Sequence, residues 1–320
     1  MAAAGGLFTM ARTLTRHRVR IFAYHGVSRE IDSALNFDGF FVHPDAFEKH
    51  LRTFKGHYHV MPLTEIVRAL AEGRPLPPNA AAITFDDGYA NNFARAAPLL
   101  AKYELPATFF VTTGFIDGTH FPWWFALRAK VFSVQCSVFS LPDGTQRPLK
   151  TLQDRLEVAV QWERRLKELP ANERNDFIRK LCPEHTTRDT RHAPFMTWDQ
   201  IRALAAQGHE IGAHTVSHVS LGHESFETLE REVADSMARI DEELGYCSPV
   251  YSYPYGERGH FKEDLAEVLR RNGCVGGVTT LDGLNAPKAE PFFLKRLNVT
   301  GNHGRNEFRA LACGLSTFFK

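Results

Sequence analysis

The chain has 320 residues, of which 43% are hydrophobic and 12% aromatic, so it is long enough to bury a large core. Its 38 Lys and Arg residues nearly balance 37 Asp and Glu residues, and the formal net charge of +1 argues against nucleic acid or another strongly charged macromolecule as the partner. A neutral or weakly charged substrate fits this balance better.

Residues 1–18 are expected to form a flexible arm. Their apolar residues are interrupted by Thr9 and Arg12, so they lack the continuous apolar run of a secretory signal, and no run in the chain approaches the roughly 20 apolar residues of a membrane span. We therefore expect a soluble, cytoplasmic protein. Four arginines could still touch an anionic membrane surface, namely Arg12, Arg16, Arg18 and Arg20.

The five cysteines are an odd number and form no CxxC pair. This pattern argues against a disulfide framework or a thiolate zinc site, and we expect free, buried thiols.

The first half of the chain alternates strands with helices. Val19–Tyr24 reads as a strand that ends at His25, and Pro44 begins a helix whose apolar stripe consists of Phe47, Leu51 and Phe54. The next elements are a strand near His59–Met61, a helix at about Thr64–Ala71, a strand at Ala81–Phe85, a helix marked by Phe93, Ala97 and Leu100, and a strand at Ala107–Thr112.

The alternation stops at about residues 115–194, which read as an insertion after a strand. The insertion contains an aromatic run at Pro122–Phe125, a hairpin around Asp143-Gly144, and two helical segments at about 151–169 and 172–182. It could be a lid that shapes the substrate site or a second small subdomain, and the sequence leaves both open.

Regular alternation resumes after the insertion. A capping box formed by Thr197 and Gln200 opens a helix that stops at Gly208, and Ser225 can cap a long helix closed by Gly245. Three further strands follow, at Val250–Tyr253, Cys274–Thr279 and Phe292–Val299, together with helices at Phe261–Asn272 and after Asn306.

These elements give seven or eight strands. Length alone would allow about two domains, but the regular alternation favours a single α/β barrel. In such a barrel the carboxyl ends of the strands meet on one face, so polar residues that follow different strands would surround one site.

Two adjacent carboxylates follow the apolar run Ala81–Phe85. Neighbouring side chains of an extended chain point to opposite sides, so Asp86 and Asp87 cannot serve the same task unless the backbone turns, and Gly88 supplies that turn. We interpret one carboxylate as a metal ligand and the other as a proton acceptor. The plainer alternative is an Asp-Asp-Gly turn that only solvates the strand end.

Two histidines follow another predicted strand, at positions 214 and 218. Side chains four residues apart lie on one face of a helical turn, and neutral imidazole is a ligand of zinc and related metals. Together with Asp87, His214 and His218 would form a two-histidine, one-carboxylate site with positions left open for water and substrate.

Three motifs in this order, TFDDGY, HTVSH and YPYG, resemble the first motifs of the NodB-type polysaccharide deacetylases, carbohydrate esterase family four. The resemblance extends through Tyr24–Val27, Leu105–Val111 and Gly208–Gly212, and covers most of the chain outside the insertion. It implies a distorted (β/α) barrel of seven or eight strands over residues 19–320, with the helical insertion placed within it.

The resemblance also implies a metal-dependent hydrolase that removes N-acetyl groups from amino sugars of a polysaccharide, its precursor or a glycolipid. Asp86 would act as the base and water on the metal as the nucleophile, while the backbone N–H of Tyr255 would contribute to the oxyanion hole and its ring would pack on a sugar. The expected cofactor is a divalent metal, Zn²⁺ first, with Co²⁺, Ni²⁺, Mn²⁺ or iron as alternatives.

Two departures from the family pattern affect single residues. Ser252 occupies the place of an arginine that holds the catalytic aspartate in the family, and Arg296 is the candidate replacement, against the alternative of a surface salt bridge. The late Leu-x-His motif, which supplies the general acid, is not clearly present, so His25 and His303 are both candidates. Trp123 and Trp124 could stack on sugar rings or could only pack.

Two other functions remain open at this point. The same site could serve a deformylase of a lipid-linked sugar or an O-acetyl esterase. The chain could also be an inactive carbohydrate-binding barrel, although such a module has no need of both aspartates and both histidines.

Overall fold

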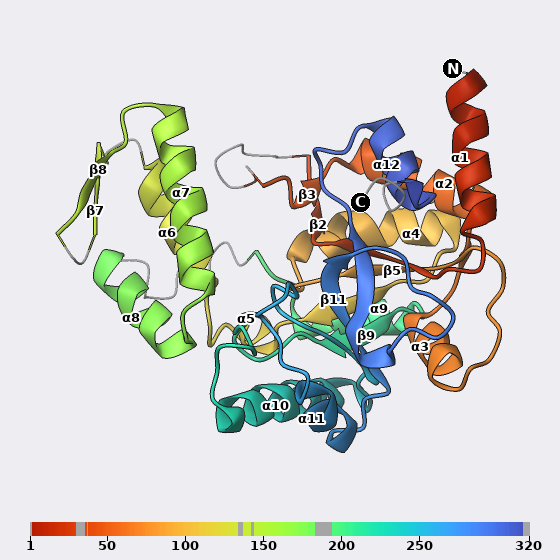
Figure 1. Cartoon of the computed structure of the whole chain (residues 1–320). Helices are drawn as coiled ribbons and strands as arrows, with labels where there is room; N and C mark the ends of the chain where they lie inside the picture. The colour runs from red at the N-terminus through yellow and green to blue at the C-terminus, as the bar shows by residue number, and fades with distance from the viewer. Residues whose placement is uncertain are drawn as a thin grey trace.

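The protein is described by a computed structural model over residues 2–29, 36, 38–133, 137–141, 144–182 and 194–315, with side chains given from residue 6 onward. Seven parallel strands form the sheet at its centre (Figure 1), and the predicted α/β barrel is confirmed. In spatial order they are β10 (Val250–Ser252), β11 (Gly276–Asp282), β12 (Leu294–Asn298), β1 (Arg20–Tyr24), β5 (Ala80–Phe85), β6 (Thr108–Val111) and β9 (Glu210–Ala213).

The barrel is nearly closed between its two terminal strands. The backbone N–H of Ser248, just before β10, donates to the carbonyl of Ile211 in β9 at 2.8 Å. The eighth strand of the sheet, β4 (His59–Val60), pairs with β5 outside the ring.

The strands are parallel and buried on both faces, which explains their continuous apolar sequences. Every residue of β1 and β5 is buried. The two strands pair in register from Arg20 opposite Ala81 to Tyr24 opposite Phe85, so their carboxyl ends stop side by side. His25 and Asp86 therefore emerge at the same rim.

The helices surround the sheet: α2 (Pro44–His57), α3 (Leu63–Ala71), the π-helical turn η1 (Asn92–Ala96) with α4 (Ala97–Tyr103), α5 (Thr113–Ile116), α9 (Trp198–Ala206), α10 (Phe226–Leu244), α11 (Leu265–Arg271) and α12 (Arg305–Ala312). The predicted capping box at Thr197 and Gln200 is present, and so is the left-handed C-terminal glycine of α10, Gly245. The helix predicted from Phe261 begins at Leu265 instead.

A 3₁₀ turn, η4 (Pro291–Phe293), precedes β12, and β2 (Gly26–Val27) pairs with β3 (Phe41–Val42) beside the rim.

The N-terminal segment differs from the flexible arm that the sequence predicts. Residues Ala2–Leu14 form helix α1, which stands at one edge of the molecule beside α2 and α12 (Figure 1). Phe8 and Ala11 are buried against Cys313, and they lie seven and four residues before Thr15, which is also buried. Apolar contact with the end of α12 therefore accounts for the ordered helix. None of the helices that the structure describes is long and apolar enough to cross a membrane.

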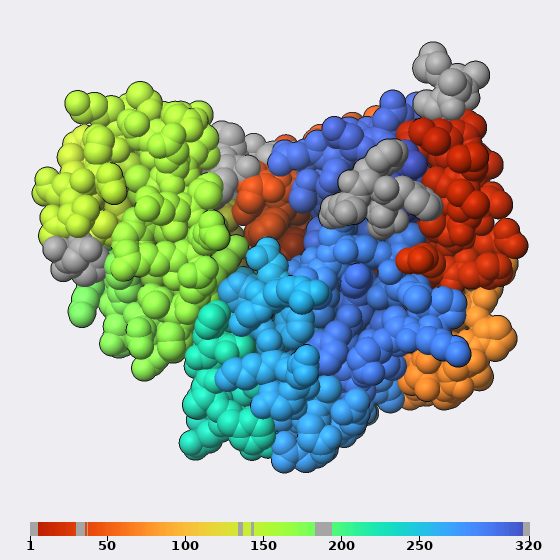
Figure 2. Space-filling model, viewed as in Figure 1, coloured from red at the N-terminus to blue at the C-terminus, as the bar shows by residue number. Residues whose placement is uncertain are grey.

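The insertion forms a lobe beside the barrel, with a hollow between the two in the space-filling view (Figure 2). It consists of α6 (Trp123–Phe132), the hairpin β7 (Val138–Ser140) and β8 (Gln146–Pro148), α7 (Leu152–Lys167) and α8 (Ala171–Leu181). The predicted hairpin and helices are present, while residues 134–136, 142–143 and 183–193, including Cys136 and Asp143, lie outside the described part. The lobe has its own apolar cluster, which continues into Tyr89 and Phe115 at the barrel rim.

An ion pair also fixes the lobe to the barrel. Arg128 of α6 is buried between Glu163 of α7, at 2.6 Å, and Asp38 of the barrel side. These two carboxylates raise the pKa of Arg128 against the effect of burial. The lobe is therefore held to the rim by both apolar and charged contacts.

Candidate metal centre

Asp86 and Asp87 directly follow strand β5 and point to different partners, as the sequence predicts. Asp87 has a left-handed backbone with φ of 73°, and Gly88 follows with φ of 85°. This turn directs the carboxylate of Asp87 toward two histidines and leaves that of Asp86 facing β12. A non-glycine residue with positive φ is strained, and such strain persists where the surroundings fix a functional geometry.

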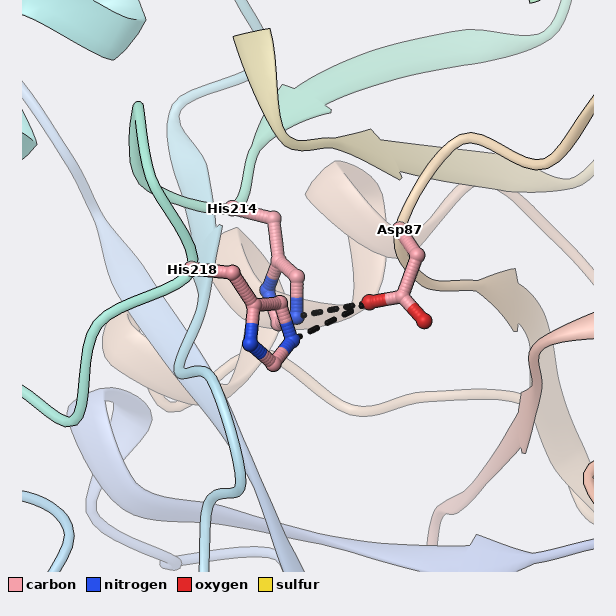
Figure 3. Close-up of side chains that lie close together, drawn as sticks. All are labelled: Asp87, His214 and His218. Carbon is pink, nitrogen blue, oxygen red and sulfur yellow. Dashed lines mark ion pairs between the residues drawn. The ribbon is translucent and has the colours of Figure 1, made fainter. Parts of the chain in front are cut away.

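The three predicted metal ligands lie together (Figure 3). Oδ1 of Asp87 is 3.5 Å from Nε2 of His214 and 3.2 Å from Nε2 of His218, and one ligand atom from each residue falls within 4.8 Å of the others. All three side chains are buried. The set has the composition of a two-histidine, one-carboxylate centre for a divalent metal.

The backbone between the two histidines is not the helical turn that the spacing predicts. Residues 214–218 form a bend in which Thr215 and His218 both have positive φ, 63° and 55°. The carboxylate of Glu232, on α10, accepts hydrogen bonds from the N–H groups of Val216 and Ser217, at 2.8 and 3.0 Å. These amides are held from outside the segment, so the bend replaces a helix.

Glu232 and Tyr251 are functional residues that the sequence analysis missed. Glu232 lies three residues after Leu229 and directly before Val233 of the core stripe of α10, so a glutamate beside that stripe was the available signal. The hydroxyl of Tyr251 accepts a hydrogen bond from the N–H of Thr215 at 3.0 Å. The two residues together fix the segment that carries both histidines.

The orientation and protonation of the ligands fit a bound cation. Nδ1 of His214 faces the carbonyl of Ser252 at 2.8 Å, which leaves Nε2 for the centre. Oδ1 of Asp87 is buried and receives no hydrogen bond from any described residue. A buried carboxylate oxygen without a donor is costly unless a cation completes its surroundings.

The pKa directions agree with this assignment. Burial acts to raise the pKa of Asp87, but the neighbouring imidazoles of His214 and His218 hold it well below its usual range. Burial lowers the pKa of His218 to about 4 despite the nearby carboxylate. An ionised Asp and a neutral His are the forms that ligate metals.

Asp86 is held by Arg296, the residue expected to replace the family's arginine. The guanidinium of Arg296 donates to both carboxylate oxygens, at 2.8 and 2.6 Å, and the hydroxyl of Ser252 adds a bond to Oδ1 at 3.2 Å. Both charged side chains are fully or almost fully buried, which excludes the alternative of a surface salt bridge. Burial opposes ionisation, yet Arg296 lowers the pKa of Asp86.

The YPYG motif forms a tight turn next to His218. Tyr255 has φ of 62° and Gly256 has φ of 59°, and a Cβ atom at Gly256 would lie 2.5 Å from the backbone nitrogen of Thr280. The backbone N–H of Tyr255 makes no hydrogen bond to any residue that the structure describes. The side-chain hydroxyl of Tyr255 accepts a hydrogen bond from the indole N–H of Trp123 at 3.0 Å.

A cavity of about 270 Å³ opens over these residues. The barrel contributes Asp86, Asp87, His214, His218 and Tyr255 to its wall. The lobe contributes the opposite side through Trp124, Arg128, Glu163 and Lys167. The insertion is therefore a folded lobe that also shapes the cavity.

The remaining predicted site residues differ in whether they line this cavity. Trp124 lines the cavity and meets His218 edge to face, with ring centroids 4.9 Å apart, whereas Trp123 lies behind Tyr255 and is absent from the wall. His25 also lines the cavity, stacked on Phe40, while His303 lines a different cavity. Trp124 and His25 thus keep access to a substrate, and Trp123 and His303 do not.

A fourth histidine at the cavity, His260, is a further residue that the sequence analysis missed. Its Nδ1 lies 2.8 Å from the hydroxyl of Ser220, and its ring is 5.2 Å from that of Tyr255. It follows the YPYG motif by four residues, but nothing in the sequence around it indicates that it returns to the cavity.

Comparison with known proteins agrees with this geometry. The family model described as "Polysaccharide deacetylase" matches residues 73–276. The candidate polysaccharide deacetylase YxkH of Bacillus subtilis (strain 168) is 20% identical over 294 residues, which cover 92% of this chain and 75% of YxkH. The poly-beta-1,6-N-acetyl-D-glucosamine N-deacetylase of Escherichia coli (strain K12) is 33% identical over 60 residues, 19% of this chain and 9% of that protein.

A solved structure has the same fold. The Streptococcus pyogenes deacetylase PplD, in complex with acetate, superposes with a TM-score of 0.62 at 19% sequence identity, covering 91% of this chain and 96% of that one. The match spans the barrel and extends over most of the chain.

Proposed function

This chain belongs to the polysaccharide deacetylase family, and on this basis we propose that it is a metal-dependent hydrolase that removes N-acetyl groups from amino sugars of a polysaccharide, its precursor or a glycolipid. One observation carries the proposal: two adjacent carboxylates are given different partners. Asp87 faces two imidazoles, and Asp86 faces a guanidinium. Amide hydrolysis needs both a charge-stabilising centre and a separate proton acceptor.

Asp87, His214 and His218 would hold the divalent metal. When bound there, the metal would lower the pKa of water and polarise the acyl carbonyl. Zn²⁺ is the first candidate, because tetrahedral sites of histidine and carboxylate suit it, and Co²⁺, Ni²⁺ or Mn²⁺ are alternatives.

Asp86 would take the proton from the attacking water. Arg296 keeps this carboxylate ionised and fixes its orientation. Oδ2 accepts only the Arg296 bond among the described residues, so it retains a lone pair for a proton. Asp86 also lines the cavity, where it can reach a reacting molecule.

Tyr255 and His25 would complete the reaction. The unpaired N–H of Tyr255 is available to donate to the oxygen that becomes negative when water adds to the carbonyl. When the carbon–nitrogen bond breaks, the leaving amine needs a proton, and His25 at the cavity wall would supply it. The ring of Trp124 would pack on the sugar.

The test of His25 compares it with the neighbouring histidine of the same cavity. We expect His25→Ala to lower turnover about a hundredfold, the usual range for loss of a general acid, and His260→Ala to lower it less. The pH–rate profile should lose its basic limb only in the His25 variant. A larger effect of His260→Ala on that limb would transfer the role of the acid to His260.

The test of the reaction is acetate release from N-acetylglucosamine oligomers and from lipid-linked N-acetyl sugars. Chelator-treated protein should be inactive and should regain activity with Zn²⁺ or Co²⁺. We expect Asp87→Ala to lose both metal and activity, and Asp86→Asn to keep the metal and lose turnover. Asp86→Asn with near-normal turnover would contradict the assignment of the base.

Other outcomes identify the alternatives. Stoichiometric metal without acetate release would favour another acyl group, and formate release or O-acetyl hydrolysis should then be measured. Protein that binds no metal and releases no acyl group would favour a carbohydrate-binding barrel.

A further inference from the structure

A second cavity, of about 600 Å³, lies between α2 and α12. Its wall holds four side chains with permanent positive charge and no carboxylate: Lys49, Arg52, Arg305 and Arg309. Three histidines, His50, His57 and His303, also line it. We call this cavity the basic groove. Since positive and negative residues nearly balance over the whole chain, a wall of one sign is a local concentration of charge.

Most of these cations have no carboxylate partner among the residues that the structure describes. Arg52 pairs with Glu48 at 3.2 Å. Lys49 and Arg305 are exposed and form no ion pair with any residue that the structure describes, and Arg309 likewise lacks a carboxylate partner there. The groove therefore keeps an attraction for negative charge.

Helix α1 presents an apolar face to solvent. Leu7, Met10 and Leu14 are spaced by three and four residues, so they lie on one side of the helix, and they are 44%, 58% and 66% exposed. The adjoining side carries Phe8 and Ala11, which are buried. Only part of the apolar surface of α1 is therefore buried against the rest of the protein, and the remainder faces solvent.

The basic groove and α1 are continuous. The guanidinium of Arg309 lies over the ring of Phe8, 4.8 Å from its centroid. Burial lowers the pKa of His57 in the groove, and the charges of Arg12 and Arg309 lower it further. Figure 1 shows α1, α2 and α12 side by side at one edge of the molecule.

We propose that α1 and the basic groove form one docking surface for an anionic lipid bilayer. A bilayer offers negative headgroups to Lys49 and Arg305 and an apolar phase to Leu7, Met10 and Leu14. A small anion alone would satisfy the groove and leave the helix face in water. Amphipathic helices flanked by cations bind the interface of anionic membranes without crossing it.

The docking surface lies next to the catalytic cavity but does not depend on the proposed activity. Thr300 lines the catalytic cavity, and its backbone N–H donates to Nδ1 of His303, which lines the basic groove, at 3.0 Å. A bound bilayer would therefore be one loop away from the cavity. If the proposed function holds as well, a lipid-linked amino sugar could reach the metal centre from the bilayer.

The experiment measures binding of the full chain to vesicles of phosphatidylcholine with and without phosphatidylglycerol, by co-sedimentation. We expect binding that requires the anionic lipid at about 0.1 M salt and weakens at high salt. Lys49→Ala with Arg305→Ala should weaken it by about fivefold for each cation. Leu7→Gln, Met10→Gln and Leu14→Gln together should weaken binding at both salt concentrations, since glutamine preserves helix propensity and removes the apolar contact.

Matched controls come from other faces of the protein. Arg231→Ala with Lys288→Ala removes two exposed cations that line neither cavity, and Leu152→Gln with Val160→Gln removes two exposed apolar side chains of α7. Both should bind vesicles as the unmodified chain does. Thermal unfolding checks that every variant is folded.

Three outcomes would overturn the proposal. One is absence of vesicle binding at low salt, and another is equal weakening by the control variants. The third is a different occupant: inorganic phosphate bound in the groove without vesicle binding, or a dimer in light scattering that the three glutamine substitutions abolish.

Discussion

The catalytic cavity and the basic groove meet at the loop of residues 299–304 and hold charge in opposite ways. In the catalytic cavity Asp86 and Arg296 are buried and face each other, and Asp87 faces two imidazoles. In the basic groove, Lys49 and Arg305 are exposed and unpaired among the described residues. Charge removed from water needs a partner in the protein, whereas water stabilises an exposed cation and leaves it available to bind an anion.

The catalytic cavity and the basic groove also differ in the backbone φ angles of the residues around them. Six non-glycine residues of the described chain have positive φ, and four of them surround the catalytic cavity: Asp87, Thr215, His218 and Tyr255. None of the six lines the basic groove. The catalytic cavity therefore requires fixed positions of particular atoms, while the groove requires only a concentration of charge.

The largest effect on stability is expected from Arg296→Met. The substitution leaves Asp86 buried without its partner, and breaking such a pair lowers the free energy of unfolding by about 3–5 kcal/mol. Urea unfolding measures the change. Lys295→Met, at the exposed neighbouring position of the same strand, is the control. A loss no larger than that of the control would mean that Asp86 is not held in the way described.

Glu232→Gln is expected to weaken metal binding by about 10–100-fold, as does loss of other groups that orient ligands. The two carboxylate oxygens of Glu232 accept hydrogen bonds from the N–H groups of Val216 and Ser217 and from the hydroxyl of Ser217. Glutamine offers only one acceptor oxygen for these three donors. Metal titration of the chelator-treated protein measures the effect. Glu227→Gln, exposed on the same helix, should bind metal normally, and an equal loss there would remove the special role of Glu232.

His50 is the buried titratable group of the basic groove and should make the fold sensitive to acid. Burial, with smaller contributions from His303 and Lys49, lowers the pKa of His50 to about 3. The folded state then binds this proton less readily than the unfolded state, so stability falls as pH drops below the ordinary histidine value of about 6.5 and continues to fall toward pH 3.

Between pH 7 and pH 5 this linkage predicts a loss of about 2 kcal/mol in the free energy of unfolding. His50→Asn should remove that part of the pH dependence, whereas His17→Asn, at an exposed position, should not. Urea unfolding at the two pH values decides between them. Identical pH dependence in the unmodified chain and in His50→Asn would contradict the prediction.

The smallest effect is expected from Lys49→Ala. An exposed cation without an ion pair contributes little to folding, so the free energy of unfolding should change by no more than about 0.5 kcal/mol. The same urea measurement applies. A loss of several kcal/mol would show that Lys49 has a partner in the folded protein and would end the contrast with Arg296.

Much of the fold was predictable because local chemistry repeats along the chain. The strand predicted at Ala81–Phe85 forms as β5, and the capping box at Thr197 and the C-terminal glycine of α10 are present as expected. The N-terminal helix was not predictable in the same way. Its order depends on contact between Phe8 and Cys313, two residues separated by almost the whole chain.

The candidate site divides similarly. Ordered motifs identify Asp86, Asp87 and the two histidines, because the residue types themselves imply ligands and a base. The bend between the histidines was predicted as a helical turn, since the hydrogen bonds from Glu232 that stabilise the bend come from another element.

The sequence by itself determined the alternation of strands and helices, the family and the residues that can bind a metal. Only the tertiary structure decided that Arg296 pairs with Asp86, that His25 and Trp124 reach the cavity while His303 and Trp123 do not, and that cations of α2 and α12 line one groove. Strand and helix preferences act over a few residues and can be read locally. Which side chains meet across a barrel depends on strand order and register, and these are set by the packing of the whole chain.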